Sequence, residues 1–344
     1  MRVLTKRELN RALLARQRLL GRSKASLPPA LERIGGIQAQ YAPSIYVGLW
    51  TRLEGFRREQ LARALRRRSV AQGTLMRVTI HLVSAGDYWP LALAIREPRR
   101  RLWLRAHKGK PGAAELSRAA AKLRRALAGR TMSHKEITEL IGGGSVMLNG
   151  VGLWLDLVRV PPSGTWERRR ADLYGLAEDW IGEPRASVEE GIKLLVRRYL
   201  QGFGPATKAE IADWAGVPPK AIEAALASIR LRRFAAEDGA ELLDLPRAPL
   251  PDPETPAPVR FLPVWDATLL VHARRTEILP EEHRRKVFNV RTPQSVNTFL
   301  VDGRVAGTWR EHRGRIELSP FRRLDRRTRR ELEAEAERLI ELWA

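Results

Sequence analysis

The sequence predicts an α+β protein that is mainly α-helical with small β wings. We expect three tandem winged helix-turn-helix units followed by a C-terminal β-rich segment. Three observations support this fold class. One helix-start motif recurs three times. A helix–turn–helix–hairpin pattern comes after its third copy. A proline-rich stretch then separates these units from strand-like alternating sequence near the C-terminus.

The recurring motif is a Thr or Ser followed three residues later by Glu. It occurs at Thr5–Glu8, Ser133–Glu136 and Thr207–Glu210. In such a capping box the hydroxyl accepts the N3 backbone N–H, and the carboxylate accepts the N–H of the cap residue. A single copy is common in helical proteins, so the prediction depends on the helices, turns and hairpins expected after each copy.

The first unit is predicted over residues 1–128. Helices are expected over residues 7–20 and 29–34, and a further helix is expected to begin near Pro43. This unit is longer than a minimal winged helix, and it contains a candidate catalytic segment between its second and third helices.

Residues 75–83 alternate between polar and apolar side chains, which predicts a strand with one apolar face. Arg77, Thr79 and His81 fall on its polar face. They are candidate DNA contacts, and the alternative of a solvated wing face carries nearly equal weight.

The second unit is predicted over residues 129–185. A helix is expected over 136–141, three glycines at 142–144 end it, and a new apolar segment is expected over 151–160. No Gly-Lys-Ser/Thr comes after the glycines, so they do not form a phosphate loop. Trp166 and the neighbouring arginines are expected on or beside the wing.

The third unit, residues 186–245, shows the plan most clearly. A short helix over 211–215 is followed by Gly216, a favoured C-cap, and prolines open a second helix over 218–229. Residues 231–245 are expected to pair as two strands around an Asp-Gly turn.

Residues 246–258 contain six prolines and are predicted to be a linker or a surface-draped loop. Residues 259–344 form the predicted C-terminal domain, which ends in an amphipathic helix over 325–343. Within it, a hairpin is expected over 296–309. A second turn contains His312 and Arg313, which are candidates for probing a DNA groove.

Charge and composition narrow the function. The 344 residues carry 62 Lys plus Arg against 39 Asp plus Glu, a formal charge of +23. A GC-rich genome explains a preference for Arg over Lys, but not the excess of both over acids. The field of such a chain attracts polyanions, of which nucleic acid is the commonest large one. The basic clusters are spread along the chain, which indicates a long binding surface.

Several classes of function are excluded. The chain has no cysteine, so disulfides, thiolate-bound clusters and cysteine nucleophiles are absent. The histidines lack metal-ligand spacing, and we expect neither a metal nor another cofactor. No lysine lies in an apolar strand where it would serve a Schiff-base mechanism. No apolar run approaches the ~18 residues of a membrane span, and the N-terminus lacks a signal peptide. We therefore expect no membrane partner and a cytoplasmic location.

The segment from Ile34 to Pro43 contains two Gln residues, Gln38 and Gln40, flanked by a Gly-Gly pair and a proline. At a spacing of two they share one side of an extended chain, whereas on a helix they point apart. The flanking residues interrupt helix, which favours the extended form with both carboxamides facing one pocket. The alternative is that both amides cap a helix or bond loop backbone.

This segment resembles the Gln-aliphatic-Gln motif of the AlkZ/YcaQ-type winged-helix DNA glycosylases. Residues 73–83, 261–270 and 301–310 match the same family's pattern, so the likeness covers nearly the whole chain. The YcaQ branch has Asp at the second polar position of the motif. Gln40 at that position makes this chain similar to the AlkZ branch.

The resemblance implies a monofunctional glycosylase of base-excision repair. Its partner would be double-stranded DNA that carries N7-alkylated purines, and some members unhook interstrand crosslinks. N7 alkylation makes the base cationic and weakens its glycosidic bond, so the leaving group needs no acid. Gln38 and Gln40 would hold the attacking water and stabilise the positive sugar.

Two further hypotheses remain from the sequence. A winged-helix transcriptional regulator without catalysis explains the charge and the fold equally well. A regulator usually has one DNA-reading unit per subunit and a dimer interface. Three unequal units in one chain instead fit a monomer that clamps nucleoid DNA. A protein-interaction scaffold is the other hypothesis, for which the third unit is the best candidate.

Overall fold

The computed structural model describes residues 1–270, 275–288 and 295–344. All three predicted capping boxes are present in it, at the starts of α1 (Lys6–Arg16), α7 (His134–Ile141) and α11 (Lys208–Ala215). A fourth box, not anticipated from the sequence, joins Ser187 and Glu190 at the start of α10 (Val188–Phe203). Capping boxes therefore mark the starts of these four helices.

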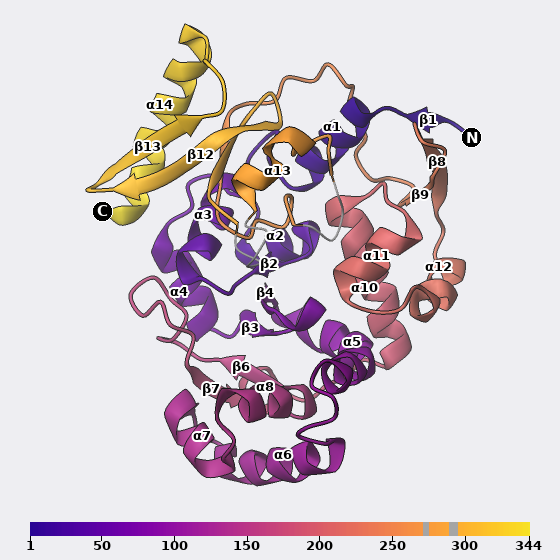
Figure 1. The fold of residues 1–344 in the computed structure, drawn as a ribbon, viewed down its shortest axis with the longest axis vertical. Coiled ribbons are helices and arrows are strands. Elements are labelled where there is room, and N and C mark those ends of the chain that lie inside the picture. The colour runs from indigo at the N-terminus through magenta and orange to yellow at the C-terminus, as the bar shows by residue number, and fades with distance from the viewer. Residues whose placement is uncertain (271–274, 289–294) are drawn as a thin grey trace.

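The N-terminal segment supplies the centre of the molecule (Figure 1). In chain order its other elements are β1 (Val3–Leu4), α2 (Leu27–Ile34), β2 (Ile37–Gln38), α3 (Ala42–Arg52), α4 (Arg58–Arg66), β3 (Val70–Thr74), the 3-10 turn η1 (Met76–Val78), β4 (Ile80–Ser84) and α5 (Ala85–Ala106). The three helices expected here are present within a few residues of their predicted bounds.

The predicted continuous strand over residues 75–83 is wrong. The chain reverses there, because η1 joins β3 to β4 and Arg77 and Val78 adopt positive φ angles of 53° and 59°. The Leu75 N–H donates to the Thr79 carbonyl at 2.9 Å and closes the loop. A turn removes the two-faced alternation of a strand, so Leu75 and Met76 are both buried.

The next segment contains α6 (Ala113–Leu127), β5 (Met132–Ser133), α8 (Gly144–Trp154), β6 (Leu157–Arg159), β7 (Leu173–Leu176) and α9 (Ala177–Ile181), with α7 between β5 and α8. The three glycines break the helix as predicted, each with positive φ. The apolar segment expected over 151–160 is instead the end of α8 followed by β6, because α8 already begins at Gly144. Trp166 lies in the loop between β6 and β7, where its ring meets Tyr46 edge-on at 5.3 Å.

The third segment matches its prediction closely. After α10 and α11 come η2 (Pro219–Ile222), α12 (Glu223–Ser228) and the hairpin of β8 (Arg232–Ala236) and β9 (Glu241–Asp244). Gly216 caps α11 in the left-handed conformation, at φ 72°.

The C-terminal segment is β-rich, with β10 (Arg260–Leu262), α13 (Glu281–Val287), β11 (Thr298–Val301), β12 (Arg304–His312), β13 (Arg315–Pro320), α14 (Arg326–Ile340) and η3 (Glu341–Trp343). Both predicted turns are present, and the side chain of Asp325 caps the terminal helix. The β12–β13 hairpin and α14 lie together at one edge of the molecule (Figure 1).

Strand pairing joins segments that are distant in the sequence. A six-stranded sheet has the order β2-β4-β3-β6-β7-β5 and so combines the first two segments. β1 pairs in parallel with β8, which ties the N-terminus to the third segment. The proline-rich segment has no helix or strand, and Arg11 and Arg16 of α1 donate to its carbonyls at Thr255 and Pro249. Among the described residues, no helix combines the length and apolar character needed to cross a membrane.

Candidate active site at Gln38 and Gln40

Two glycines set the position of the candidate site. Gly35 ends α2 in the left-handed conformation, at φ 79°, and Gly36 comes next at φ 80°. A Cβ on Gly36 would lie 2.9 Å from the Val83 side chain and 3.1 Å from the Leu82 carbonyl. The chain can therefore leave the helix and join the sheet as β2 within two residues only if both positions are glycine.

β2 is an edge strand that pairs antiparallel with β4, and Gln38 lies opposite His81. The predicted extended form is thus present at Ile37 and Gln38, and the Ala39 N–H continues the pairing by donating to the Ile80 carbonyl at 2.7 Å. The Gln38 side chain is buried, with 7% of the residue exposed, whereas Gln40 is exposed. The Gln38 Nε2 group donates a hydrogen bond to Gln40 Oε1. The two carboxamides meet on one side of the chain.

Arg77 approaches this pair from η1. Its guanidinium donates to the Trp214 carbonyl at 2.6 Å and to Gln38 Oε1 at 3.4 Å. Burial lowers the pKa of Arg77 to about 10, which still leaves it charged at neutral pH. A relay of donors thus runs from Arg77 to Gln38 to Gln40, and it fixes which way the Gln38 amide faces.

Thr79 and His81 do not present the open polar strand face that the alternation predicted. The His81 ring is buried, with 3% of the residue exposed, and its Nδ1 lies 3.1 Å from the Thr79 carbonyl. The Thr79 hydroxyl donates to the Met76 carbonyl at 3.0 Å. Burial and repulsion by Arg77 lower the pKa of His81 to about 3, so its imidazole is neutral at physiological pH.

A buried ion pair supports the site from below. Arg52 of α3 binds both oxygens of Asp266, at 2.7 and 2.9 Å. Burial alone would raise the pKa of Asp266, but Arg52 and the hydrogen bonds from Thr268 hold it below its ordinary value. Asp266 belongs to one of the stretches that carried the family resemblance. It holds the loop after β10 against α3.

Gln17 connects this ion pair to the surrounding helices. Its Nε2 donates to the carbonyls of Ile34 and Gly202, at 3.1 and 2.8 Å, and its Oε1 accepts from Arg52 at 3.3 Å. Gln17, Arg52 and Gln38 line one small recess, which has room for about one water molecule. Sequence patterns did not single out Gln17 or Arg52, because their partners lie on segments distant along the chain.

The remaining predicted DNA contacts lie elsewhere. His312 and Arg313 occupy the tip of the β12–β13 hairpin at the edge of the molecule, while β2 lies near its centre (Figure 1). His312 Nδ1 lies 2.9 Å from a carboxylate oxygen of Glu317. The structure therefore brings Arg77, Thr79 and His81 to the Gln pair and keeps the hairpin tip apart. Within the described ranges, no three His, Asp or Glu side chains cluster as metal ligands would.

Comparison with known proteins places the chain in a class, the DNA glycosylases. Residues 31–342 match the model of a family described as DNA glycosylase AlkZ-like. The match spans more than half of the chain, so the protein belongs to the AlkZ-like DNA glycosylase family, which implies binding to DNA.

The structural comparison agrees with this family. The chain is similar to the DNA glycosylase AlkZ of Streptomyces sahachiroi, with a TM-score of 0.82 and 18% sequence identity. The alignment covers 99% of this chain and 97% of that one. At this identity the likeness establishes a shared fold. A search of curated proteins found no significant match to the sequence.

Proposed function

We propose that this protein is a monofunctional DNA glycosylase of base-excision repair that hydrolyses the N-glycosidic bond of N7-alkylated purines. The observation that carries the proposal is the meeting of the Gln38 and Gln40 carboxamides, oriented by Arg77. Neutral amides suit a cationic lesion, because its leaving group needs no acid and oriented amide dipoles can stabilise its positive sugar.

The proposed reaction breaks the bond between C1′ and N9. The bonding pair moves to the alkylated purine, which leaves as a neutral base, and the sugar becomes an oxocarbenium ion. Water then bonds to C1′ and releases a proton to solvent. Gln40 Oε1 retains a second lone pair that can accept an O–H of this water and so direct its oxygen towards C1′. The neutral imidazole of His81 adds no second positive charge beside Arg77.

We further propose that three winged-helix units grip the duplex. Two segments support this arrangement. Helices α6 to α8 precede the β6–β7 hairpin, and helices α10 to α12 precede the β8–β9 hairpin. The units would be bounded as predicted, at residues 1–128, 129–185 and 186–245, and would hold the phosphate backbone without reading base sequence. We infer a monomer that acts on nucleoid DNA.

The central test is the double variant Gln38→Ala/Gln40→Ala. On duplex DNA that contains 7-methylguanine, we expect base release to fall by about 100-fold or more, the scale seen when positioned dipoles are removed from an active site. Affinity for the duplex should stay within about twofold of the unsubstituted protein. Full residual activity in the double variant would overturn the catalytic assignment.

Gln60→Ala provides a control for the loss of a glutamine side chain outside the candidate site. Gln60 is exposed on α4, and this variant should retain activity. Alkali treatment of the product distinguishes a glycosylase from a DNA-binding regulator, because only a glycosylase leaves abasic sites that alkali cleaves. A parallel substrate with an N7-linked interstrand crosslink tests crosslink unhooking. There a base cannot be flipped freely, because it is tethered to the opposite strand.

A further inference from the structure

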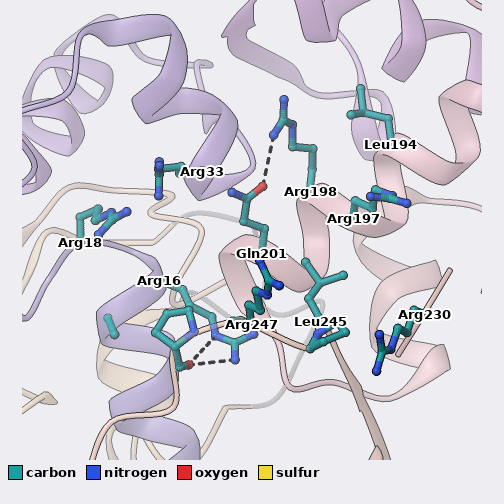
Figure 2. Close-up of a pocket in the computed structure, with 14 residues that line it drawn as sticks. Arg16, Arg18, Arg33, Leu194, Arg197, Arg198, Gln201, Arg230, Leu245 and Arg247 are labelled. Carbon is teal, nitrogen blue, oxygen red and sulfur yellow. Dashed lines mark hydrogen bonds between the residues drawn. The ribbon is translucent and has the colours of Figure 1, made fainter. Parts of the chain in front are cut away.

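A cleft of about 750 Å³ opens between the C-terminal end of α1, the end of α2 and one face of α10 (Figure 2). Among the described residues, seven arginines line it. Two of them are neutralised: Arg16 pairs with Asp244, and Arg198 pairs with Asp87 and Glu32. The other five determine what the cleft can bind.

These five arginines come from five separate parts of the chain and face one space. They are Arg18, Arg33, Arg197, Arg230 and Arg247. The side chain of each makes no ion pair or hydrogen bond with a described residue. Figure 2 shows Arg18 and Arg33 on one side of the cleft and Arg197 and Arg230 on the other. Like charges in one concave space repel each other, so the free cleft favours anions.

Arg18 shows the energetic cost of this arrangement most directly. It adopts a left-handed backbone conformation, at φ 59°, which disfavours any residue with a Cβ. Its Nε is buried without a partner among the described residues. Burial and the charge of Arg33 lower the pKa of Arg18. The left-handed φ ends α1, because the Arg18 N–H donates to the Ala15 carbonyl and the Leu19 N–H donates to the Leu14 carbonyl. The unmet Nε donor is therefore the observation at this position that points to a ligand.

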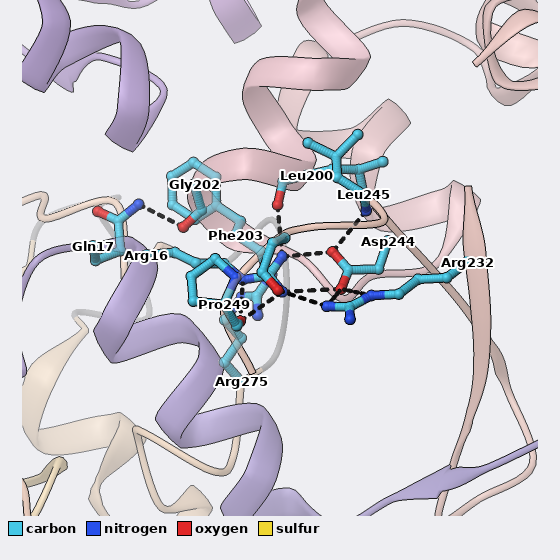
Figure 3. A network of polar contacts seen from close by, with 11 residues as sticks. Arg16, Gln17, Leu200, Gly202, Phe203, Arg232, Asp244, Leu245, Pro249 and Arg275 are labelled. Carbon is cyan, nitrogen blue, oxygen red and sulfur yellow. Dashed lines mark hydrogen bonds and ion pairs between the residues drawn. The ribbon is translucent and has the colours of Figure 1, made fainter. Parts of the chain in front are cut away.

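A network of ion pairs and hydrogen bonds forms the base of the cleft (Figure 3). Arg16 binds both oxygens of Asp244, at 2.7 and 3.0 Å, and donates to the carbonyls of Leu200 and Pro249. Arg232 donates twice to the same carboxylate, at 2.6 and 2.9 Å. Both carboxylate oxygens of Asp244 are bound within this network. Asp244 therefore does not neutralise the five unpaired arginines of the cleft.

The cleft is separate from the Gln38–Gln40 site because the two lie on opposite faces of α10. Arg197 and Gln201 of α10 line the cleft. Tyr199, about 200° away around a helix of 3.6 residues per turn, accepts a hydrogen bond from Arg275 and packs its ring 5.4 Å from that of Trp214. The Trp214 carbonyl binds Arg77, which binds Gln38.

We propose that this arginine cleft is a second anion site, distinct from the candidate catalytic pair, that binds its ligand through two or more phosphate groups. Several guanidiniums provide the planar donors that phosphate oxygens accept. Leu194, Leu245 and Pro249 add apolar surface against which the organic part of such a ligand packs. The phosphates come either from a free polyphosphate or from the backbone of DNA beyond the lesion.

The experiment uses the full-length protein and two probes, inorganic tripolyphosphate and an undamaged duplex. Calorimetric titrations at several salt concentrations, centred on about 0.15 M, compare three proteins. These are the unsubstituted chain, the cleft variant Arg33→Gln/Arg197→Gln and the control Arg326→Gln/Arg329→Gln. The control removes the same charge from exposed arginines of α14. All substituted positions are exposed, so equal melting temperatures are expected.

We expect the cleft variant to bind tripolyphosphate at least tenfold more weakly than the control. If its duplex affinity stays equal to that of the control, the source is a free polyphosphate. If its duplex affinity falls, with a salt slope reduced by about 1–2, the source is the DNA backbone. Equal binding of both probes by the cleft variant and the control would overturn the proposal. None of these outcomes depends on base release, so they are independent of the proposed catalysis.

Discussion

Two regions of this molecule rest on the same kind of support and present different chemistry to solvent. Beneath the Gln38–Gln40 site, Arg52 binds Asp266 through two hydrogen bonds. Beneath the arginine cleft, Arg16 binds Asp244 in the same bidentate manner. Above the first pair lie two neutral carboxamides, whereas above the second lie five unpaired guanidiniums.

The difference separates scaffolding from recognition. A buried arginine–carboxylate pair contributes little net stability, because desolvation offsets the attraction, but it fixes the segments that it joins. The groups outside the pair then determine what each region binds. A cationic lesion calls for oriented dipoles, and a phosphate ligand calls for cations that no carboxylate neutralises.

The largest expected effect comes from removing the carboxylates of the two supports. Asp266→Ala and Asp244→Ala should each lower the free energy of unfolding by about 3–5 kcal/mol, because a buried charge loses its partner. Asp244→Ala should cost more, since its carboxylate serves both Arg16 and Arg232. Urea unfolding measures both values. A loss below about 1 kcal/mol would show that the pairs are not scaffolds.

On the Gln38 side, buried His81 should make the stability of the fold depend on pH. The pKa of His81 is lowered to about 3, so the unfolded chain takes up a proton near pH 6.5 while the folded chain does not. Stability from this group is complete above about pH 6.5 and is lost as the pH falls towards 3. Between pH 7 and 5 the loss is about 2 kcal/mol. His81→Asn should remove this component from paired urea titrations, and an unchanged pH dependence would contradict it.

Arg77 should affect catalysis through Gln38 rather than through folding. We expect Arg77→Met to lower kcat about tenfold and leave KM for lesion DNA nearly unchanged, a loss of about 1.4 kcal/mol in the transition state. Arg77→Lys retains a donor and should recover part of the rate. A rise in KM with constant kcat would instead assign Arg77 to duplex binding.

The smallest expected effect concerns α10, the helix shared by both regions. Ser187 caps this helix and accepts the backbone N–H of Glu190. Ser187→Ala should lower stability by about 1 kcal/mol, while Ser187→Asp, which can still cap, should restore it. Because the cap lies outside both sites, base release and tripolyphosphate binding should change together or remain unchanged. A selective loss of either would show that the two faces of α10 are not equivalent.

Local patterns along the chain predicted much of the fold. The capping boxes, the Asp-Gly turns and the C-cap at Gly216 each depend on neighbouring residues, and each is present. The alternation over residues 75–83 misled, since a strand and a tight turn can carry the same short pattern. Only the bond from Leu75 to Thr79, together with two positive φ angles, distinguishes the turn.

For the candidate site, the sequence by itself determined the extended Gln38–Gln40 pair, because glycines and a spacing of two act locally. The tertiary structure alone decided the rest. Arg77 reaches Gln38 because the turn at η1 places it there, and Asp266 reaches Arg52 across more than 200 residues of chain. The arginine cleft likewise exists only where α1, α2, α10 and the segment after β9 converge. Which charges remain unpaired depends on contacts between distant segments, and no local pattern encodes those contacts.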